Sequence, residues 1–357
     1  MIIRGIDTLE YGLDIEDYEE ALRPLLERFK LLKEEGQKYG ITKEMELNGV
    51  YLTVEKNGMP FYPYRLTCKD FSIGFVDKRN ENNPDIKVKM MSGFLWSLKA
   101  KQAYETIIDW LSGLGVKIIR SRISRLDICV DTDKARFVPA DIEGFVTRAS
   151  AKVKHYVSDE YQEGRYFSGI TIGRGKPLLC RIYDKSREIK KSGKVWFYPL
   201  WMDSGWDWES TVWRVEFQLR RKALKELGID SVEDLWSKEE SLWSYLTGEW
   251  LQLKTPNKDN VSRWPEKRKW TLIRKAQSGY EASPLVRKQV KQGDAKRLLD
   301  QGSGILFSLG AVKGCDSIEK ALELLRQHGE GKLRKENIDF RAKMSQRRRK
   351  YINGEVN

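Results

Sequence analysis

Three segments in the middle of the chain alternate apolar and polar residues, and their polar residues include acids, bases and a phenol. The segments are residues 123–131, 179–185 and 213–220. Side chains on a β-strand point alternately to its two faces, so each segment predicts a strand with one apolar and one polar face. The polar faces carry Arg125, Asp127, Asp131, Arg181, Tyr183, Lys185, Arg214 and Glu216. A sheet with one solvated face gives the same alternation without any function, so the composition of the three faces together is the informative feature.

This set of side chains suits the cleavage of a phosphodiester. Carboxylates can hold Mg²⁺ or Mn²⁺, hard cations that prefer oxygen ligands and polarise a phosphoryl oxygen. The oxygen of Tyr183 can attack phosphorus and form a covalent intermediate. A phenol has an ordinary pKa of about 10, so it needs nearby cations or a metal to become a nucleophile. Two basic residues stand two positions from Tyr183, and we expect them to supply that charge and to hold the phosphate. They are Arg181 and Lys185.

The chain has only two histidines, His155 and His328, which are far apart in the sequence. This excludes metal motifs built on paired histidines, a His-Glu-x-x-His zinc site and the histidine-containing box of tyrosine recombinases. The four cysteines are scattered without a Cys-x-x-Cys pair, which indicates neither a zinc site nor a disulfide framework. We therefore expect any chemistry to proceed without imidazole.

The composition predicts a polyanionic partner. The 357 residues include 65 Lys and Arg against 52 Asp and Glu, a net charge of +13, and basic surfaces gain affinity by releasing counterions from phosphate backbones. The start of the chain is not a signal peptide, and no apolar run approaches about 18 residues. We expect a cytoplasmic protein without a membrane partner.

The coarse pattern predicts an α+β fold. Helical spacing appears at about residues 15–39 and 96–111, residues 118–220 are β-rich, and residues 284–357 read as helices. That last region holds seventeen Lys and Arg against nine Asp and Glu. We expect three parts: residues 1–110, a β-rich half at 111–283, and a basic helical region at 284–357. The central antiparallel sheet should have one helix-packed face and one open catalytic face.

At these residues the sequence resembles a known family. Residues 169–175, Gly-Ile-Thr-Ile-Gly-Arg-Gly, followed by 179–185, resemble the hairpin-and-tyrosine motif of the Rep_trans family. These proteins are rolling-circle replication initiators of Gram-positive plasmids, together with the related MOBT relaxases of integrative conjugative elements. Residues 125–131 are similar to the family's Arg-hydrophobe-Asp-hydrophobe-x-hydrophobe-Asp strand, and 213–219 to its Arg-x-Glu strand. Residues 5–9 and 262–265 also resemble family segments. The resemblance covers about residues 5–275.

The resemblance implies a sequence-specific, metal-dependent DNA nicking-closing enzyme with an HUH-like architecture that lacks the histidine pair. By position, Tyr183 would be the nicking nucleophile, which forms a 5′-phosphotyrosine link and leaves a free 3′-OH. Asp127 and Glu216 match the acidic positions around Mg²⁺ or Mn²⁺, and Asp131 would either assist them or cap the strand end. Two basic residues match the positions that flank the tyrosine. They are Arg181 and Lys185.

Four further basic residues are expected to contact DNA: Arg125, Arg214, Arg174 and Lys176. The last two lie in a turn, residues 173–177, that is short and glycine-rich where family members often carry a Ser-rich or Lys-rich turn. This difference leaves open which hairpin side chains touch phosphate. Residues 195–213 contain five tryptophans. They would either stack on unpaired bases or pack a long loop, and the sequence leaves both readings open.

Three functions are compatible with these patterns. Initiation of rolling-circle replication is favoured over nicking at an oriT by a conjugative relaxase, because no DNA-binding domain precedes Gly5. The third hypothesis is a non-catalytic basic regulator that binds nucleic acid without metal and forms no covalent adduct. For the initiator, the expected partners are double-stranded origin DNA, the nicked single strand, a host helicase and a second copy of the chain in a homodimer.

Overall fold

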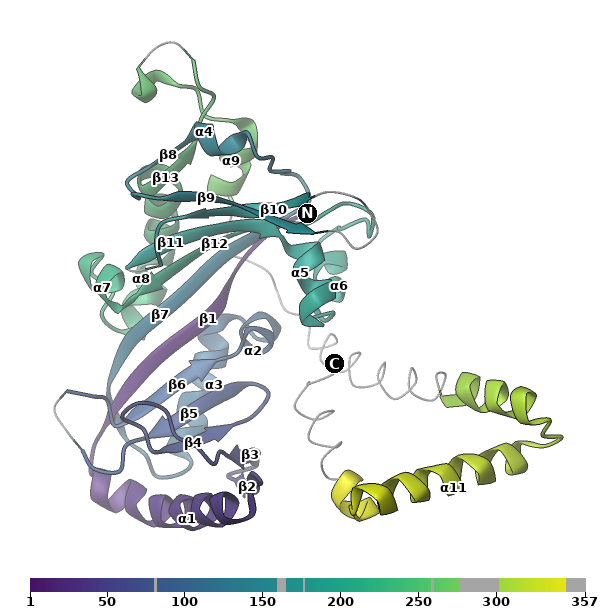
Figure 1. Cartoon of the computed structure of the whole chain (residues 1–357). Coiled ribbons are helices and arrows are strands. Elements are labelled where there is room, and N and C mark those ends of the chain that lie inside the picture. Colours follow the sequence, from purple (N-terminus) through teal and green to yellow (C-terminus); the bar gives the residue numbers. More distant parts are fainter. Residues whose placement is uncertain (80–81, 159–164, 176, 258–259, 277–301, 345–357) are drawn as a thin grey trace. The chain divides into compact units, whose positions relative to one another are not determined.

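The computed structural model describes residues 1–357 except 80–81, 159–164, 176, 258–259, 277–301 and 345–357 (Figure 1). The chain divides into two compact units, Met1–Ala282 and Ser283–Asn357. Lys176, one of the residues expected to contact DNA, lies outside the described residues.

The first unit contains eleven described strands in one sheet, in the order β2-β3-β4-β5-β6-β1-β7-β12-β11-β10-β9, and its neighbouring strands run antiparallel. A small second sheet pairs β8 with β13. The strands are β1 (Ile2–Ile15), β2 (Lys43–Leu47), β3 (Val50–Val54), β4 (Tyr64–Thr67), β5 (Phe71–Phe75), β6 (Ile86–Met90), β7 (Ile118–Thr132), β8 (Phe145–Thr147), β9 (Lys152–Ser158), β10 (Arg165–Ile172), β11 (Leu178–Asp184), β12 (Trp213–Arg220) and β13 (Leu251–Leu253). The predicted α+β fold with a central antiparallel sheet is confirmed.

Helices pack against both faces of this sheet. They are α1 (Tyr18–Tyr39), α2 (Ser92–Ser97), α3 (Ala100–Ser112), α4 (Asp141–Gly144), α5 (Lys185–Ser192), α6 (Phe197–Asp203), α7 (Arg221–Glu226), α8 (Val232–Tyr245) and α9 (Arg268–Arg274), with single turns at Leu246–Trp250 and Val261–Arg263. Phe217 is fully buried, and the rings of Trp243 on α8 and Trp250 lie 5.7 and 6.0 Å from it. On the other half of the sheet, Tyr104 of α3 packs against Tyr11 of β1. The alternation of apolar residues along β1, β7 and β12 is therefore explained by burial under α3 and α8.

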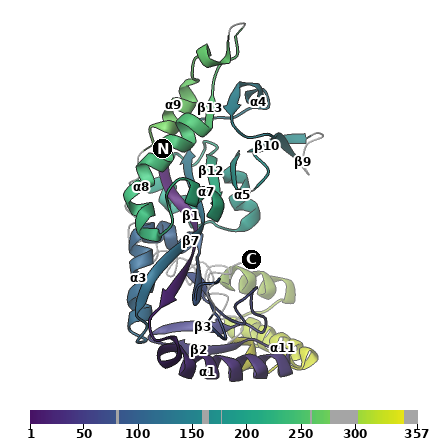
Figure 2. The same ribbon diagram turned by 90° about the vertical axis from the view of Figure 1, so that its left-hand side faces the viewer.

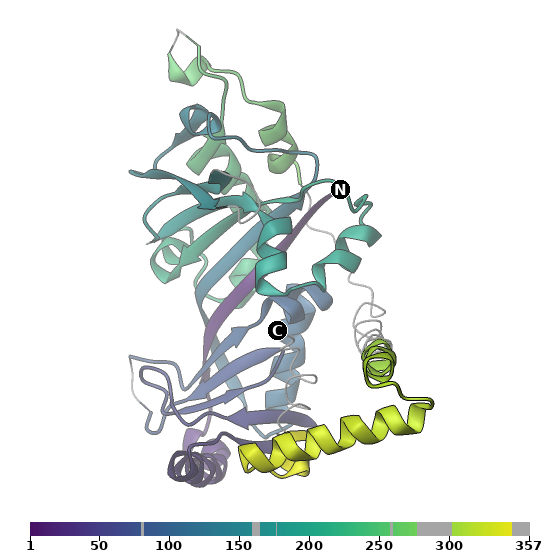
Figure 3. The ribbon, with the colours of Figure 1, turned by 45° about the vertical axis from the view of Figure 1, so that its right-hand side comes forward.

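Two helices lie on the other face. Figure 2 shows α8 and α5 on opposite sides of the sheet, and Figure 3 turns α5 and α6 toward the viewer. Their buried residues Ile189, Phe197 and Trp201 form a second apolar cluster with Ile3 and Cys129 of the sheet. The polar face is therefore partly covered, where the sequence predicted an open one.

The long strands β1 and β7 join residues 1–110 and 111–283, which the sequence analysis predicted as separate parts. β1 pairs with β6, before residue 110, along Leu9–Leu13, and with β7, after residue 110, along nearly its whole length. The helix expected at residues 96–111 is broken into α2 and α3, because Lys99 between them has φ of +29°. The first helix begins at Tyr18 and contains Pro24.

The second unit is described from residue 302 to 344, and its longest element is α11 (Ile318–Glu336). Ser317 caps the start of α11 by accepting a hydrogen bond from the Lys320 amide, and Asn337 ends it in the left-handed conformation. Ala321 is the one buried apolar residue among those described in this unit. Throughout the described residues, no helix is both long and apolar enough to cross a membrane.

Candidate active site

The strand register brings the three predicted polar faces together. β12 lies between β7 and β11, so Glu216 stands opposite Arg181 on β11, and Arg214 stands opposite Tyr183. On the other side of β12, Arg214 stands opposite Asp131. Residues that are more than 80 positions apart in the chain thereby share one surface.

Tyr183 and Glu216 form the contact with the clearest chemical meaning. The Tyr183 hydroxyl donates a hydrogen bond to Oε2 of Glu216 at 2.9 Å. Burial raises the pKa of the phenol well above 10, and the charge of Glu216 raises it further, while Arg214 acts in the opposite direction. The phenol is therefore protonated at neutral pH, and its proton already points at a carboxylate. The other oxygen of Glu216 is ion-paired with Arg181.

Asp127 lies beside this pair. Arg125 donates to both of its oxygens, from Nε at 2.9 Å and from Nη2 at 2.5 Å, and Arg181 lies 3.8 Å from Oδ2. Burial raises the pKa of Asp127, and Glu216 also raises it, whereas the hydrogen bond from Arg125 lowers it. Two carboxylates that repel each other are thus held together by two guanidinium groups. The Arg181 side chain is 40% exposed, so it remains accessible to a phosphate.

Arg214 and Asp131 form a buried ion pair beneath α6. Arg214 donates from Nε to Oδ1 of Asp131 at 2.6 Å and from Nη2 to Oδ2 at 2.8 Å, and neither side chain is exposed. The indole of Trp201 donates to Oδ2 as well, at 3.0 Å. Burial does not fit the predicted contact of Arg214 with DNA, so that residue receives a structural and electrostatic role instead. Asp131 has both oxygens occupied, which fits a structural role better than the predicted metal ligation.

Asp7 is a member of this network that the strand patterns did not reveal. Arg214 donates from Nη1 to Oδ1 of Asp7 at 2.6 Å, and Ser92 donates to the same oxygen. Burial alone would raise the pKa of Asp7, but Arg214 and Lys185 outweigh it and lower that pKa. Asp7 lies on the same face of β1 as Ile3 and Gly5, and the pairing of β1 with β7 is irregular between Ile6 and Thr8. The signal in the sequence is the break in apolar alternation after Ile6.

Lys185 begins α5 and does not end the tyrosine strand. The Asp184 side chain accepts a hydrogen bond from the Arg187 amide, so Asp184 caps the helix and β11 stops there. Lys185 is buried, its Nζ bonds Glu188 at 2.5 Å, and it lies 5.8 Å from the centre of the Tyr183 ring. The spacing predicted that Lys185 would lie beside Tyr183 on the polar face of the strand. Instead, its ammonium group lies over the Tyr183 ring from the first turn of α5.

The remaining predicted contacts with DNA differ in exposure. Arg174, in the β10–β11 turn, is exposed, whereas Arg125 is mostly covered and bonded to Asp127. His155 is also exposed, with its Nε2 2.8 Å from the Thr171 hydroxyl. Arg174 and Arg181 are therefore the better placed of these side chains to meet a DNA backbone.

A divalent cation finds two candidate ligands on this face. Asp127 and Glu216 offer carboxylate oxygens, the donors that Mg²⁺ and Mn²⁺ prefer, and their mutual repulsion would be relieved by a cation. Among the described residues, no group of three His, Cys, Asp or Glu side chains is arranged around a single point. The donor chemistry fits a hard cation that takes its remaining ligands from water or phosphate.

Comparison with known proteins gives similarity to solved structures but no match to a protein-family model or a curated protein. Among solved structures, the chain is similar to a rolling-circle replication initiator protein from Geobacillus stearothermophilus, with 16% sequence identity and a TM-score of 0.49. The similarity covers 79% of this chain and 100% of that one. Similarity of this size does not define a function, which has to be argued from the residues of the site.

Proposed function

We propose that this chain is a metal-dependent DNA strand-nicking and closing enzyme that initiates rolling-circle replication, with Tyr183 as its nucleophile. The observation that carries the proposal is the hydrogen bond from the Tyr183 hydroxyl to Glu216, because it joins a nucleophile to a base at 2.9 Å. Arg181 on the same carboxylate and the net charge of +13 support a phosphodiester as the substrate.

The proposed reaction uses the side chains in the order that their contacts suggest. Glu216 accepts the proton of the phenol as the Tyr183 oxygen attacks phosphorus, and the bond from phosphorus to the 3′ oxygen breaks. The products are a 5′-phosphotyrosine link and a 3′-hydroxyl, which takes up a proton. Arg181 leaves Glu216 to hold the phosphoryl oxygens, since a guanidinium matches phosphate geometry. Mg²⁺ or Mn²⁺, held by Asp127 and Glu216, would polarise the phosphoryl oxygen.

Buried Arg214 supports this reaction from the neighbouring strand. Its charge lowers the pKa of Tyr183 and thus favours the phenolate. Because Asp131 and Asp7 hold the guanidinium in place, its charge is preorganised before the substrate arrives. Binding to double-stranded origin DNA and to the nicked strand follows from the proposal, while a host helicase and a homodimer stay predictions.

The decisive experiment incubates the protein with supercoiled plasmid that carries its origin, in the presence of Mn²⁺. We expect open circles with protein bound covalently at the 5′ end. Tyr183→Phe should form less than about a thousandth of the wild-type product, because the nucleophile is gone. Tyr166→Phe is the matched control: Tyr166 lies on the adjacent strand and also donates to a carboxylate, that of Asp184.

Two results would contradict the proposal. If Tyr183→Phe nicks as well as wild type, the assignment of the nucleophile is wrong. If the wild-type protein binds DNA equally with and without metal and forms no covalent adduct on a single-stranded suicide substrate, the chain is a non-catalytic regulator.

A further inference from the structure

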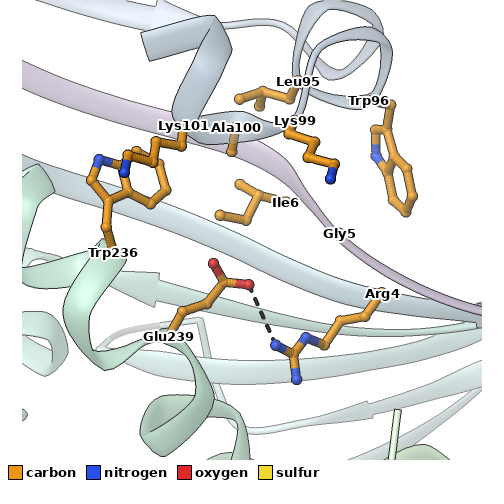
Figure 4. A pocket seen from close by; sticks show the side chains of 10 residues that line it. All are labelled: Arg4, Gly5, Ile6, Leu95, Trp96, Lys99, Ala100, Lys101, Trp236 and Glu239. Carbon is orange, nitrogen blue, oxygen red and sulfur yellow. Dashed lines mark hydrogen bonds and ion pairs between the residues drawn. The ribbon is translucent and has the colours of Figure 1, made fainter. Parts of the chain in front are cut away.

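A cavity of about 300 Å³ lies beside the first residues of β1, between the junction of α2 and α3 and helix α8 (Figure 4). Its size is at the lower end of pockets that hold small organic ligands. Three cations, one carboxylate and two indoles line it: Arg4, Lys99, Lys101, Glu239, Trp96 and Trp236. The strand-cleavage reaction proposed above uses none of them.

The upper wall of this cavity is positive. Lys99 and Lys101 flank Ala100, the first residue of α3, whose first turn has no acidic residue and no side-chain cap. The start of a helix carries unbonded amide groups and a partial positive charge. Figure 4 shows Lys99 extending between Ile6 and Trp96 in the direction of Arg4. The wall therefore suits an anion.

The opposite wall holds an unsatisfied donor. Arg4 is only 2% exposed, and its Nη1 donates to the Ala276 carbonyl and to Glu240, both at 3.0 Å. Its Nε is buried and has no hydrogen-bond partner. The guanidinium group also forms ion pairs with Glu239, which lines the cavity, and with Glu240. These carboxylates balance the charge of Arg4, so Lys99 and Lys101 on the facing wall supply the positive charge for an anion.

The aromatic side chains give the cavity a second character. Trp236 is half-buried and lies next to Lys101 in Figure 4, while Trp96 is buried against Gly5. A Cβ atom at Gly5 would come within 2.7 Å of the Trp96 ring, so glycine lets this indole lie directly on the strand. Indole faces stack on nucleobases, and the Glu239 carboxylate can accept a hydrogen bond from a base amino group.

We propose that this cavity binds one nucleotide, with the phosphate at Lys99, Lys101 and the start of α3 and the base against Trp236. The nucleotide is either free or one unit of a DNA strand, since both offer the same phosphate and base. Trp96 connects the cavity to the polar face, because its indole also donates to Asp7 at 3.3 Å. The site itself requires no strand cleavage.

The test measures binding by calorimetry without metal, using the full chain with Tyr183→Phe so that the result does not depend on nicking. The probes are deoxyadenosine 5′-monophosphate, deoxyadenosine without phosphate, and a 12-nucleotide oligo(dT). We expect the monophosphate to bind at least about tenfold more tightly than the nucleoside. Adding Lys99→Gly and Lys101→Gln should weaken the monophosphate at least about tenfold, and glycine suits the positive φ of position 99.

The matched control adds Lys117→Gln and Lys222→Gln, which remove two exposed lysines away from the cavity and should change neither affinity. If the Lys99 and Lys101 variant loses the monophosphate but keeps the oligonucleotide, the ligand is a free nucleotide. If it loses affinity for the oligonucleotide, the ligand is a unit of the strand. Two results would overturn the proposal. In the first, the Lys99 and Lys101 variant binds the monophosphate and the oligonucleotide as tightly as its Tyr183→Phe parent does. In the second, the parent does not bind the monophosphate, and the variant keeps the parent's affinity for the oligonucleotide.

Discussion

In the proposed reaction, the Tyr183 phenol has to lose a proton, although its surroundings favour the protonated form. Burial and the charge of Glu216 raise the pKa of this phenol well above 10, so a base must act when attack occurs. Tyr183, Glu216 and Asp127 could be selected from the sequence because strand alternation is a local pattern. Asp7 and the burial of Arg214 could not, because they depend on the pairing of β1 with β7 and β12 and on the helices that cover the face.

Replacing the proposed base tests this account at the residue scale. Glu216→Gln keeps the size of the side chain but cannot take the proton, so nicking should fall by roughly 10²–10⁴-fold. The remaining rate should rise with pH from 6 to 9, because the phenolate fraction grows tenfold per unit below the pKa. A pH–rate profile measures this, with Glu226→Gln, an exposed residue paired with Lys222, as the control. A variant with the wild-type profile would show that Glu216 is not the base.

The buried network predicts a pH-dependent stability. The pKa of Asp7 is lower in the folded state than in the unfolded state, so its contribution is complete above about pH 4 and is lost as pH falls through the lowered value. Asp7→Asn leaves Arg214 with one acidic partner fewer and should cost about 3 kcal/mol at pH 7. The difference from wild type should shrink below about pH 4. Urea unfolding at pH 7 and pH 3 measures it, and a difference that is independent of pH would contradict the network.

At the scale of elements, the segment between β11 and β12 departs most from expectation. It forms α5 and α6, and three of its four tryptophans are buried or half-buried, while Trp208 is 56% exposed. Packing of the segment against the sheet therefore explains most of this aromatic cluster, which is one of the two interpretations that the sequence left open. Periodicity identified β12 and most of β11, but helices this short carry too few turns to show a period.

The closeness of β10 and β11 gives a prediction at this scale. Gly169 stands opposite Tyr183, and a Cβ there would come within 2.2 Å of the Ile182 carbonyl oxygen. Gly169→Ala must push the tyrosine strand away, which should cost about 1–3 kcal/mol of stability. Nicking should fall by roughly 10²-fold, because the nucleophile is displaced. Gly329→Ala, in an open helical position, is the control, and equal activity of both variants would rule out this packing constraint.

At the scale of the whole molecule, the positive charge is uneven. Residues 284–357 hold seventeen Lys and Arg against nine Asp and Glu, while the candidate active site lies in the unit Met1–Ala282. Composition alone revealed this division of charge. The sheet order was beyond the sequence, because β1 pairs with a strand more than 100 residues later.

A chain that ends at residue 282 should separate duplex DNA binding from strand nicking. It should nick a single-stranded oligonucleotide at a rate similar to the full chain but bind duplex DNA more weakly. The slope of log affinity against log salt should become shallower, by about 0.9 for each lost phosphate contact. Fluorescence anisotropy over a series of salt concentrations measures this slope. An unchanged slope would show that the basic region does not contact the duplex.

The strand order β7-β12-β11 also has a consequence for synthesis on the ribosome. β9, β10 and β11 emerge before β12, yet among the described strands β11 connects to the rest of the sheet only through β12. Until β12 (Trp213–Arg220) pairs with both β7 and β11, Asp127 on β7 and Tyr183 on β11 lie in separate pieces of sheet. A nascent or prematurely terminated chain therefore carries Tyr183 away from the acidic residues that surround it in the folded protein. If Tyr183 is the nucleophile as proposed, strand cleavage requires that β12, the last of the described strands in the large sheet, has been made.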